Sequence, residues 1–172
     1  MVMKPRVRKA FLVTHVCASV GWLGAVVAFL GLAIASVVSD DIELVRAAAL
    51  TMETIAWWVL LPFSAASLIT GLIQSLGTRW GLFRHYWVTI KLIINVVSTV
   101  VLLLYTNTVA HYADLASDRS VIDIALLRSN SAIIHSSAAL VLLVVATILS
   151  VYKPAGLTRY GQRRQRADAI RP

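Results

Sequence analysis

Four long apolar runs divide this sequence, and they limit the folds open to it more than any other feature. The runs cover about residues 10–38, 46–76, 86–112 and 122–152. Each is long enough, at 1.5 Å per helical residue, to cross a hydrocarbon layer of about 30 Å. Because 59% of the 172 residues are hydrophobic and only 14% are charged, the sequence predicts an all-α membrane protein, a four-transmembrane-helix up-down bundle.

The four helices leave little chain for a soluble domain. Residues 1–153 form the predicted transmembrane domain, and residues 154–172 form a basic tail. We expect this tail to be disordered and to lie against anionic lipid headgroups. A basic tail can also bind nucleic acid, but the lipid bilayer is the expected partner here and nucleic acid is not.

The cationic residues outside the runs fall mainly on one side of the predicted membrane. Twelve lie on the side of the two termini, against three on the other side. The positive-inside rule therefore predicts a multi-pass protein with both termini in the cytoplasm. The twelve are Lys4, Arg6, Arg8, Lys9, Arg79, Arg84, Lys153, Arg159, Arg163, Arg164, Arg166 and Arg171, and the three are Arg46, Arg119 and Arg128.

Polar side chains recur at helical spacing inside the runs, and such lines are expected to face the interior of the bundle. The longest line, in the second run, consists of Glu53, Trp57, Leu60, Ser64, Ser67, Gly71 and Gln74. The third run carries Lys91, Asn95, Ser98, Leu102 and Tyr105, and the first carries His15, Ser19 and Trp22. We expect the Lys91 ammonium to reach back toward the cytoplasmic headgroups along its flexible side chain.

The four histidines form the candidate site, because ionisable residues within a membrane often serve a function. His15 and His85 lie near the cytoplasmic side, whereas His111 and His135 lie near the opposite side. With a helix break at residues 128–131 and a short surface helix at 119–127, each pair would differ in depth by about one turn, about 5 Å. Interfacial placement of His85 and His111 is an equally open interpretation.

Two pairs of neutral imidazoles suit two b-type haems, each held by two axial histidines. Copper is the alternative, since imidazole binds it well and Met52 and Cys17 offer soft ligands. Glu53 lies at the depth of His111 and His135, so we expect its carboxylate to accept a hydrogen bond from one of them and to orient that ring.

Three stretches, "THVCASVGWLGAV", "WGLFRHYWVTIKLIINVVSTVVLL" and "ILSVYKPAGLTRYG", carry a resemblance to an uncharacterised family of small four-helix membrane proteins common in actinobacteria. That resemblance covers nearly the whole chain and implies the topology and a bacterial cytoplasmic membrane. The spacing of His15 to Trp22 and Gly24, together with Lys91, is also similar to the bacterial copper-resistance D family. This shorter likeness implies metal handling.

Two hypotheses follow. In the first, the protein is a b-type cytochrome that moves electrons between a membrane quinone and an acceptor at one face. In the second, it is a non-redox membrane module that binds copper, a small molecule or a partner protein through its polar interior. The small residues Ala18, Gly21 and Ala25 allow close helix packing within one chain, in a homo-oligomer or against a partner membrane protein.

Overall fold

The computed structural model describes residues 3–77 and 81–170, and these ranges are overwhelmingly helical. Four helical segments in them are long and apolar enough to cross a membrane: Pro5–Val38, Ile42–Gly77, Tyr86–Ser117 and Ile124–Tyr152. The predicted all-α bundle is therefore confirmed. Large apolar side chains also cover much of the outer surface, which is compatible with an integral membrane protein in a lipid bilayer.

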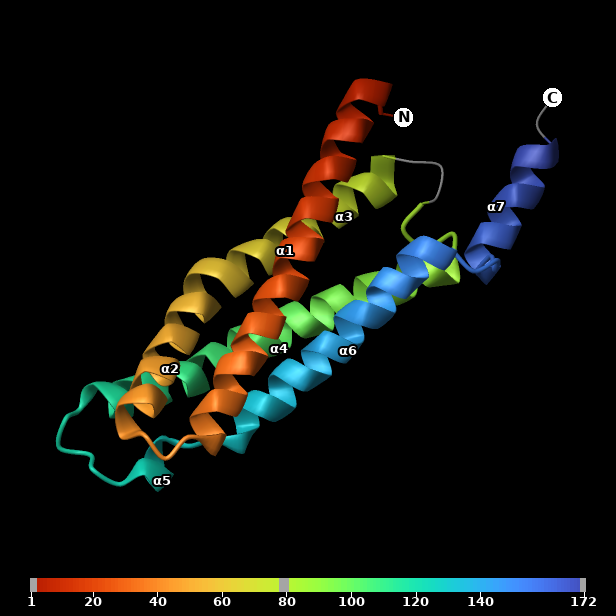
Figure 1. Cartoon of the computed structure of the whole chain (residues 1–172). Coiled ribbons are helices and arrows are strands. Elements are labelled where there is room, and N and C mark those ends of the chain that lie inside the picture. Colours follow the sequence, from red (N-terminus) through yellow and green to blue (C-terminus); the bar gives the residue numbers. More distant parts are fainter. Residues whose placement is uncertain (1–2, 78–80, 171–172) are drawn as a thin grey trace.

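The helices run alternately up and down (Figure 1). The end that carries both termini and the connection from α3 to α4 is called the inner end here, and the end with the α1–α2 connection and α5 is called the outer end. These names follow the predicted orientation, which stays a prediction. The elements are α1 (Pro5–Val38), α2 (Ile42–Ile55), the π-helical turn η1 (Ala56–Leu60), α3 (Leu61–Gly77), α4 (Tyr86–Ser117), α5 (Ile124–Leu127), α6 (Asn130–Tyr152) and α7 (Arg159–Ile170).

Helix α1 lies at the centre of the packing and contacts α2, α3 and α6. The main apolar core is built around Trp22 and Phe29 of α1, Met52 of α2, Tyr105 of α4 and Leu143 of α6. Figure 1 shows the α1–α3 pair and the α4–α6 pair diverging toward the inner end. The apolar core therefore joins the four spans, while the inner half is the part where the helix pairs separate.

The π-helical turn corrects one sequence prediction. The predicted interior line of the second span holds for Leu60, Ser64 and Ser67, which are buried, but Trp57 is 48% exposed. Steps of four residues drift around an α-helix of 3.6 residues per turn, and the wider π turn absorbs that drift. The buried row at the outer end therefore continues through Ala56 and Met52, so the prediction was wrong for Trp57.

The other two polar lines face the bundle as predicted. On α4, Ser98 and Tyr105 are buried and Lys91 is half-buried. On α1, Trp22 is 2% exposed, and His15 is half-buried against α3. The regular α-helical spacing of these two spans explains why their lines could be predicted.

The predicted break before the fourth span is also present, but the surface helix is shorter than expected. It covers Ile124–Leu127 rather than 119–127, and the Asp123 carboxylate caps it by accepting a bond from the Ala125 amide at 2.9 Å. Ser129 caps α6. Two side-chain caps this close together leave room for only one helical turn between them.

The tail after residue 153 was expected to be disordered, but α7 covers Arg159–Ile170. Its approach is fixed on the segment before α4, where the Thr158 amide donates to the Arg84 carbonyl at 3.1 Å and Leu157 forms a β-bridge with His85. The Thr158 hydroxyl then accepts a bond from the Gly161 amide at 3.1 Å. These backbone partners hold the start of the helix, which composition alone does not predict.

Candidate functional site

The outer end is held by a buried arginine. Arg46 is 5% exposed, and its guanidinium donates to the carbonyls of Ala116 at 2.7 Å, Asp118 at 2.8 Å and Val121. Carbonyls at a helix C-terminus have no partner within the helix, so a cation there satisfies them. Arg46 therefore fastens the end of α4 to α2 and has a structural role.

The other two outer arginines also pair within the chain. Arg119 lies 2.9 Å from the Glu43 carboxylate. Arg128 lies 2.9 Å from the Asp40 carboxylate and also donates to the Ser39 carbonyl. Charges at this end thus join α2 and the α1–α2 connection to the segments that follow α4.

The two outer histidines lie at different depths. The His135 ring stacks on Tyr105, with 4.2 Å between ring centroids, and its Nδ1 lies 2.8 Å from the Ser131 carbonyl oxygen. His111 is exposed and contacts the neighbouring Tyr112 ring at 5.7 Å. Because Tyr105 precedes His111 by six residues, His135 lies about 9 Å deeper along the helix axis. This offset exceeds the expected single turn and gives no support to a haem between them.

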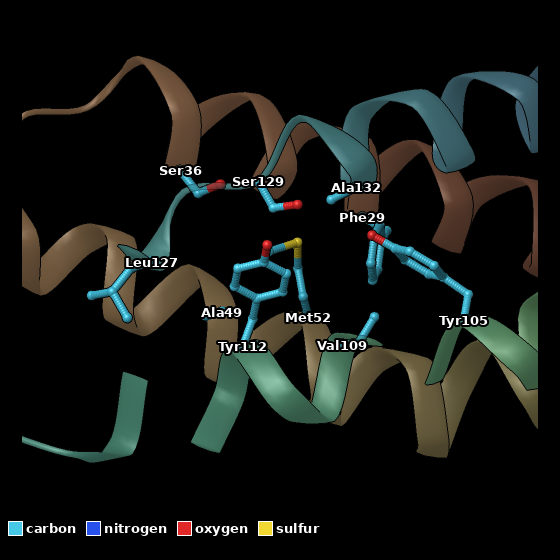
Figure 2. A pocket seen from close by; sticks show the side chains of 10 residues that line it. All are labelled: Phe29, Ser36, Ala49, Met52, Tyr105, Val109, Tyr112, Leu127, Ser129 and Ala132. Carbon is cyan, nitrogen blue, oxygen red and sulfur yellow. The ribbon is translucent and has the colours of Figure 1, made fainter. Parts of the chain in front are cut away.

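A small cavity lies between the helices of the outer half (Figure 2). Figure 2 shows the rings of Tyr105 and Tyr112 directed into it, with Met52 between the helices. Its volume is ≈ 20 Å³, enough for about one water molecule. A haem macrocycle does not fit this cavity.

The predicted hydrogen bond from an outer histidine to Glu53 has no support in the described residues. Within the described chain, no hydrogen bond joins Glu53 to His111 or His135. It lines an open surface recess with Thr54, Trp57 and Trp58. The π-helical turn explains the difference, since the buried row passes through Met52 and Ala56 and leaves Glu53 beside it.

The inner half holds the best-defined histidine. His15 Nδ1 lies 3.1 Å from the Ser67 carbonyl oxygen and 3.1 Å from the Thr70 hydroxyl oxygen. Because a carbonyl oxygen only accepts hydrogen bonds, Nδ1 must carry the proton and donate it. In the neutral ring this leaves the lone pair on Nε2, which is then available to a metal or a hydrogen-bond donor.

Polar contacts between α1 and α3 fix the position of this ring. The hydroxyls of Ser19 and Ser67 lie 2.8 Å apart, and Gln74 donates to the Phe11 carbonyl at 2.9 Å. A Cβ atom at Gly71 would lie 3.1 Å from His15 Cε1. The imidazole is therefore held between a carbonyl on one side and a glycine that leaves just enough space on the other.

Lys91 is the second component of this site. It is half-buried on α4 and lies close enough to His15 and to Lys153 to interact with both electrostatically. From the sequence, Lys91 was expected to reach toward the headgroups, and it was also a candidate for supporting the histidine site from outside the ligand set. Lys91 lies on the same polar line as Asn95 and Ser98, and this pattern could have predicted that it faces the bundle interior near His15.

His85, the predicted partner of His15, lies nearer the inner end. It caps the start of α4, six residues before Lys91, or about 9 Å along the helix axis. Its ring centroid is 6.5 Å from that of Trp87, and its backbone bridges to Leu157. Lys91 therefore acts on His15 electrostatically, and His85 as a ligand stays a prediction.

The copper ligands suggested by the sequence are not gathered together. In the described ranges, no group of three or more His, Cys, Asp or Glu side chains could hold a metal ion. Met52 is buried in the outer-half core, and Cys17 is exposed on α1. The inner polar site is thus better suited to a cofactor that needs one imidazole than to an ion that needs several ligands.

No family model matches this chain, and searches among curated proteins and solved structures also find no match. The resemblances noted in the sequence therefore stay predictions. Function must be argued from the inner polar site, which we define as His15, Ser19, Ser67, Thr70 and Lys91.

Proposed function

We propose that this protein is a b-type haem protein of the membrane, with one haem in the inner half whose iron His15 would hold. The observation that carries the proposal is the hydrogen bond from His15 Nδ1 to the Ser67 carbonyl. Histidines that bind metals commonly donate the other ring nitrogen to a carbonyl, which fixes the ring and raises its basicity. This bond leaves Nε2 of His15 free for iron.

Lys91 supports the same proposal from a second helix. A haem carries two propionate groups, and a lysine ammonium is a suitable partner for a carboxylate. Lys91 and Lys153 both lie toward the inner end, where water is near. His15 would hold the iron, and Lys91 would hold a propionate.

The proposed reaction is electron transfer between a membrane quinone and an acceptor at the inner face. When bound, haem supplies one-electron chemistry, and the protein tunes its potential through the axial ligand and the burial of the site. The half-buried His15 lies within a membrane span, where a lipid-soluble donor has access.

The experiment is a visible spectrum of protein purified from haem-replete cells, followed by titration with hemin in detergent. Wild-type protein should show a Soret band and bind about one haem per chain. His15→Ala should remove that band. Lys91→Gln should weaken hemin uptake without removing His15, because only a charge partner is lost.

His111→Ala is the matched control, because this exposed outer histidine should leave the Soret band unchanged. His85→Ala tests the second ligand: if His85 completes the coordination, its loss should convert a six-coordinate spectrum to a five-coordinate one. A colourless protein that takes up no hemin would overturn the proposal. Equal haem content in His15→Ala and wild type would overturn it as well.

A non-redox function of the same site is the second candidate. The electrostatic proximity of His15, Lys91 and Lys153 favours a small molecule with an anionic group. Such a ligand would bind with no Soret band and would depend on Lys91 more than on His15. The hemin titration separates the two candidates, since only the haem protein needs a nitrogen lone pair at residue 15.

A further inference from the structure

The recess beside Glu53 is separate from the inner polar site. It lies on the outer half of the second span, has a volume of ≈ 410 Å³ and is lined by Glu53, Thr54, Trp57 and Trp58. Pockets of a few hundred Å³ are the usual size for small ligands. The recess therefore has the dimensions of a binding site outside the proposed haem region.

The local backbone explains why these side chains face outward together. Trp57 and Trp58 belong to η1, the π-helical turn, and are 48% and 79% exposed. Glu53 and Thr54 occupy the turn before it. Single π turns inside α-helices occur frequently at functional sites. Here the turn keeps Ala56 and Leu60 in the core while two tryptophans remain outside.

The Glu53 carboxyl group is unsatisfied within the chain. Among the described residues, no hydrogen bond or ion pair reaches it, whereas Glu43, Asp40, Asp118 and Asp123 all accept bonds. Glu53 is half-buried beside two indole rings, and its carboxylate therefore remains available to a partner. A cation or a hydrogen-bond donor from outside the chain can pair with it.

The depth of the recess indicates where that partner comes from. From Trp57 to Gly77 the helix continues for twenty residues, about 30 Å, which equals the hydrocarbon thickness. Tryptophan is enriched at the membrane–water boundary. If α3 ends at the inner boundary, the recess lies at the level of the outer headgroups.

We propose that this recess binds an organic ammonium group, with Glu53 providing the opposite charge and Trp57 and Trp58 providing aromatic surface. Indole attracts cations through its ring face, and aromatic residues are the usual receptors of quaternary ammonium groups. The group can come from the ethanolamine headgroup of a lipid or from a free amine. Both sources present the same chemistry to Glu53.

The test is a titration of the full-length protein in maltoside detergent with choline chloride at constant ionic strength, followed by tryptophan fluorescence. The uncharged isostere 3,3-dimethylbutan-1-ol is titrated in parallel. Wild type should show a saturable change with choline and none with the isostere. Glu53→Gln should weaken the choline response at least tenfold, and Glu43→Gln, the control carboxylate at the same end, should leave it unchanged.

A second variant, Trp57→Leu, keeps the carboxylate and removes one indole, so it should also weaken binding. The source is distinguished in nanodiscs: if the lipid headgroup fills the site, phosphatidylethanolamine should weaken the choline response relative to phosphatidylglycerol alone, and if a free amine fills it, the two responses should be equal. No saturable response, an equal response to the isostere, or equal responses of Glu53→Gln and wild type would overturn the proposal. The Soret band does not enter this test.

Discussion

The arginines of the outer end and the histidine of the inner end differ in how fully the chain itself supplies their partners. At the outer end, Arg46, Arg119 and Arg128 all bind carbonyls or carboxylates of other segments. At the inner end, the α1–α3 and α4–α6 pairs diverge, and His15 keeps one ring nitrogen free. A chain that satisfies its charges internally gains a fixed structure. A polar group that keeps a lone pair available can instead bind a ligand.

The orientation of the bundle decides which of the two ends faces the cytoplasm. In a Cys17→Ser background, Ile122→Cys at the outer end and Arg164→Cys at the inner end offer exposed labelling positions. An impermeant maleimide should label residue 122 in intact cells and residue 164 only after lysis, because the positive-inside rule keeps the basic end in the cytoplasm. Gel-shift detection gives an all-or-none result. The reverse labelling pattern would show that the end with α7 lies outside the cell and the end with α5 lies in the cytoplasm.

If Arg46 holds the end of α4 against α2, Arg46→Met should cause the largest loss of stability among the variants proposed. The change leaves the carbonyls of Ala116, Asp118 and Val121 without their donor. Losing hydrogen bonds to a buried charged group should cost about 3 kcal/mol of unfolding free energy. Thermal unfolding in detergent measures it.

Haem content per folded chain should be the same in Arg46→Met and in wild type, because the inner polar site lies at the other end. Arg46→Lys serves as the control, since it keeps the charge but loses the forked arrangement of donors. Its stability should lie between those of Arg46→Met and wild type. A loss of haem equal to that of His15→Ala would show that the two ends are not independent.

Gly71→Ala at the inner end should have the opposite effect to Arg46→Met: hemin affinity should change and stability should not. The new Cβ would lie 3.1 Å from His15 Cε1, so the ring must shift by a few tenths of an ångström. Alanine also favours the helix by up to about 1 kcal/mol, so stability should change little. Hemin affinity should fall, because the ring nitrogen leaves its position.

Gly24→Ala is the control for that shift. A Cβ at Gly24 meets nothing within 4 Å, so stability should rise by about 0.5 kcal/mol and hemin affinity should remain that of wild type. Parallel hemin titrations of the two variants check this. Identical affinities for Gly71→Ala and Gly24→Ala would contradict the claim that the ring of His15 matters.

The sequence predicted the spans and the inner line of residues well, because a regular α-helix repeats every 3.6 residues and His15, Ser19 and Trp22 follow that repeat. It failed where the repeat changes. The π turn after Ile55 shifts the buried face, so Trp57 was wrongly assigned to the interior. The sequence also could not reveal that Lys91 acts electrostatically on His15, since the distances between side chains of different helices depend on how the spans pack.

The smallest expected effect lies in the outer connection between α4 and α5. The hydroxyl and amide of Ser120 donate to the Asp118 carboxylate at 2.7 and 2.8 Å, and these bonds lower the pKa of Asp118 from its ordinary value. A carboxyl group with a lowered folded-state pKa stabilises the fold above its unfolded pKa of about 3.8, and this contribution is lost as the pH falls through the folded value.

Ser120→Ala removes the hydroxyl bond, so it should lower the unfolding temperature slightly at pH 7, and the difference from wild type should vanish once the pH falls below the lowered folded-state pKa of Asp118. Unfolding followed at several pH values measures it. Arg46 gives the reason for expecting so little: it binds the Asp118 carbonyl from the buried side, so the backbone stays fastened when the exposed carboxylate loses a partner. A difference that persisted unchanged at low pH would mean that Ser120 acts through packing rather than through Asp118.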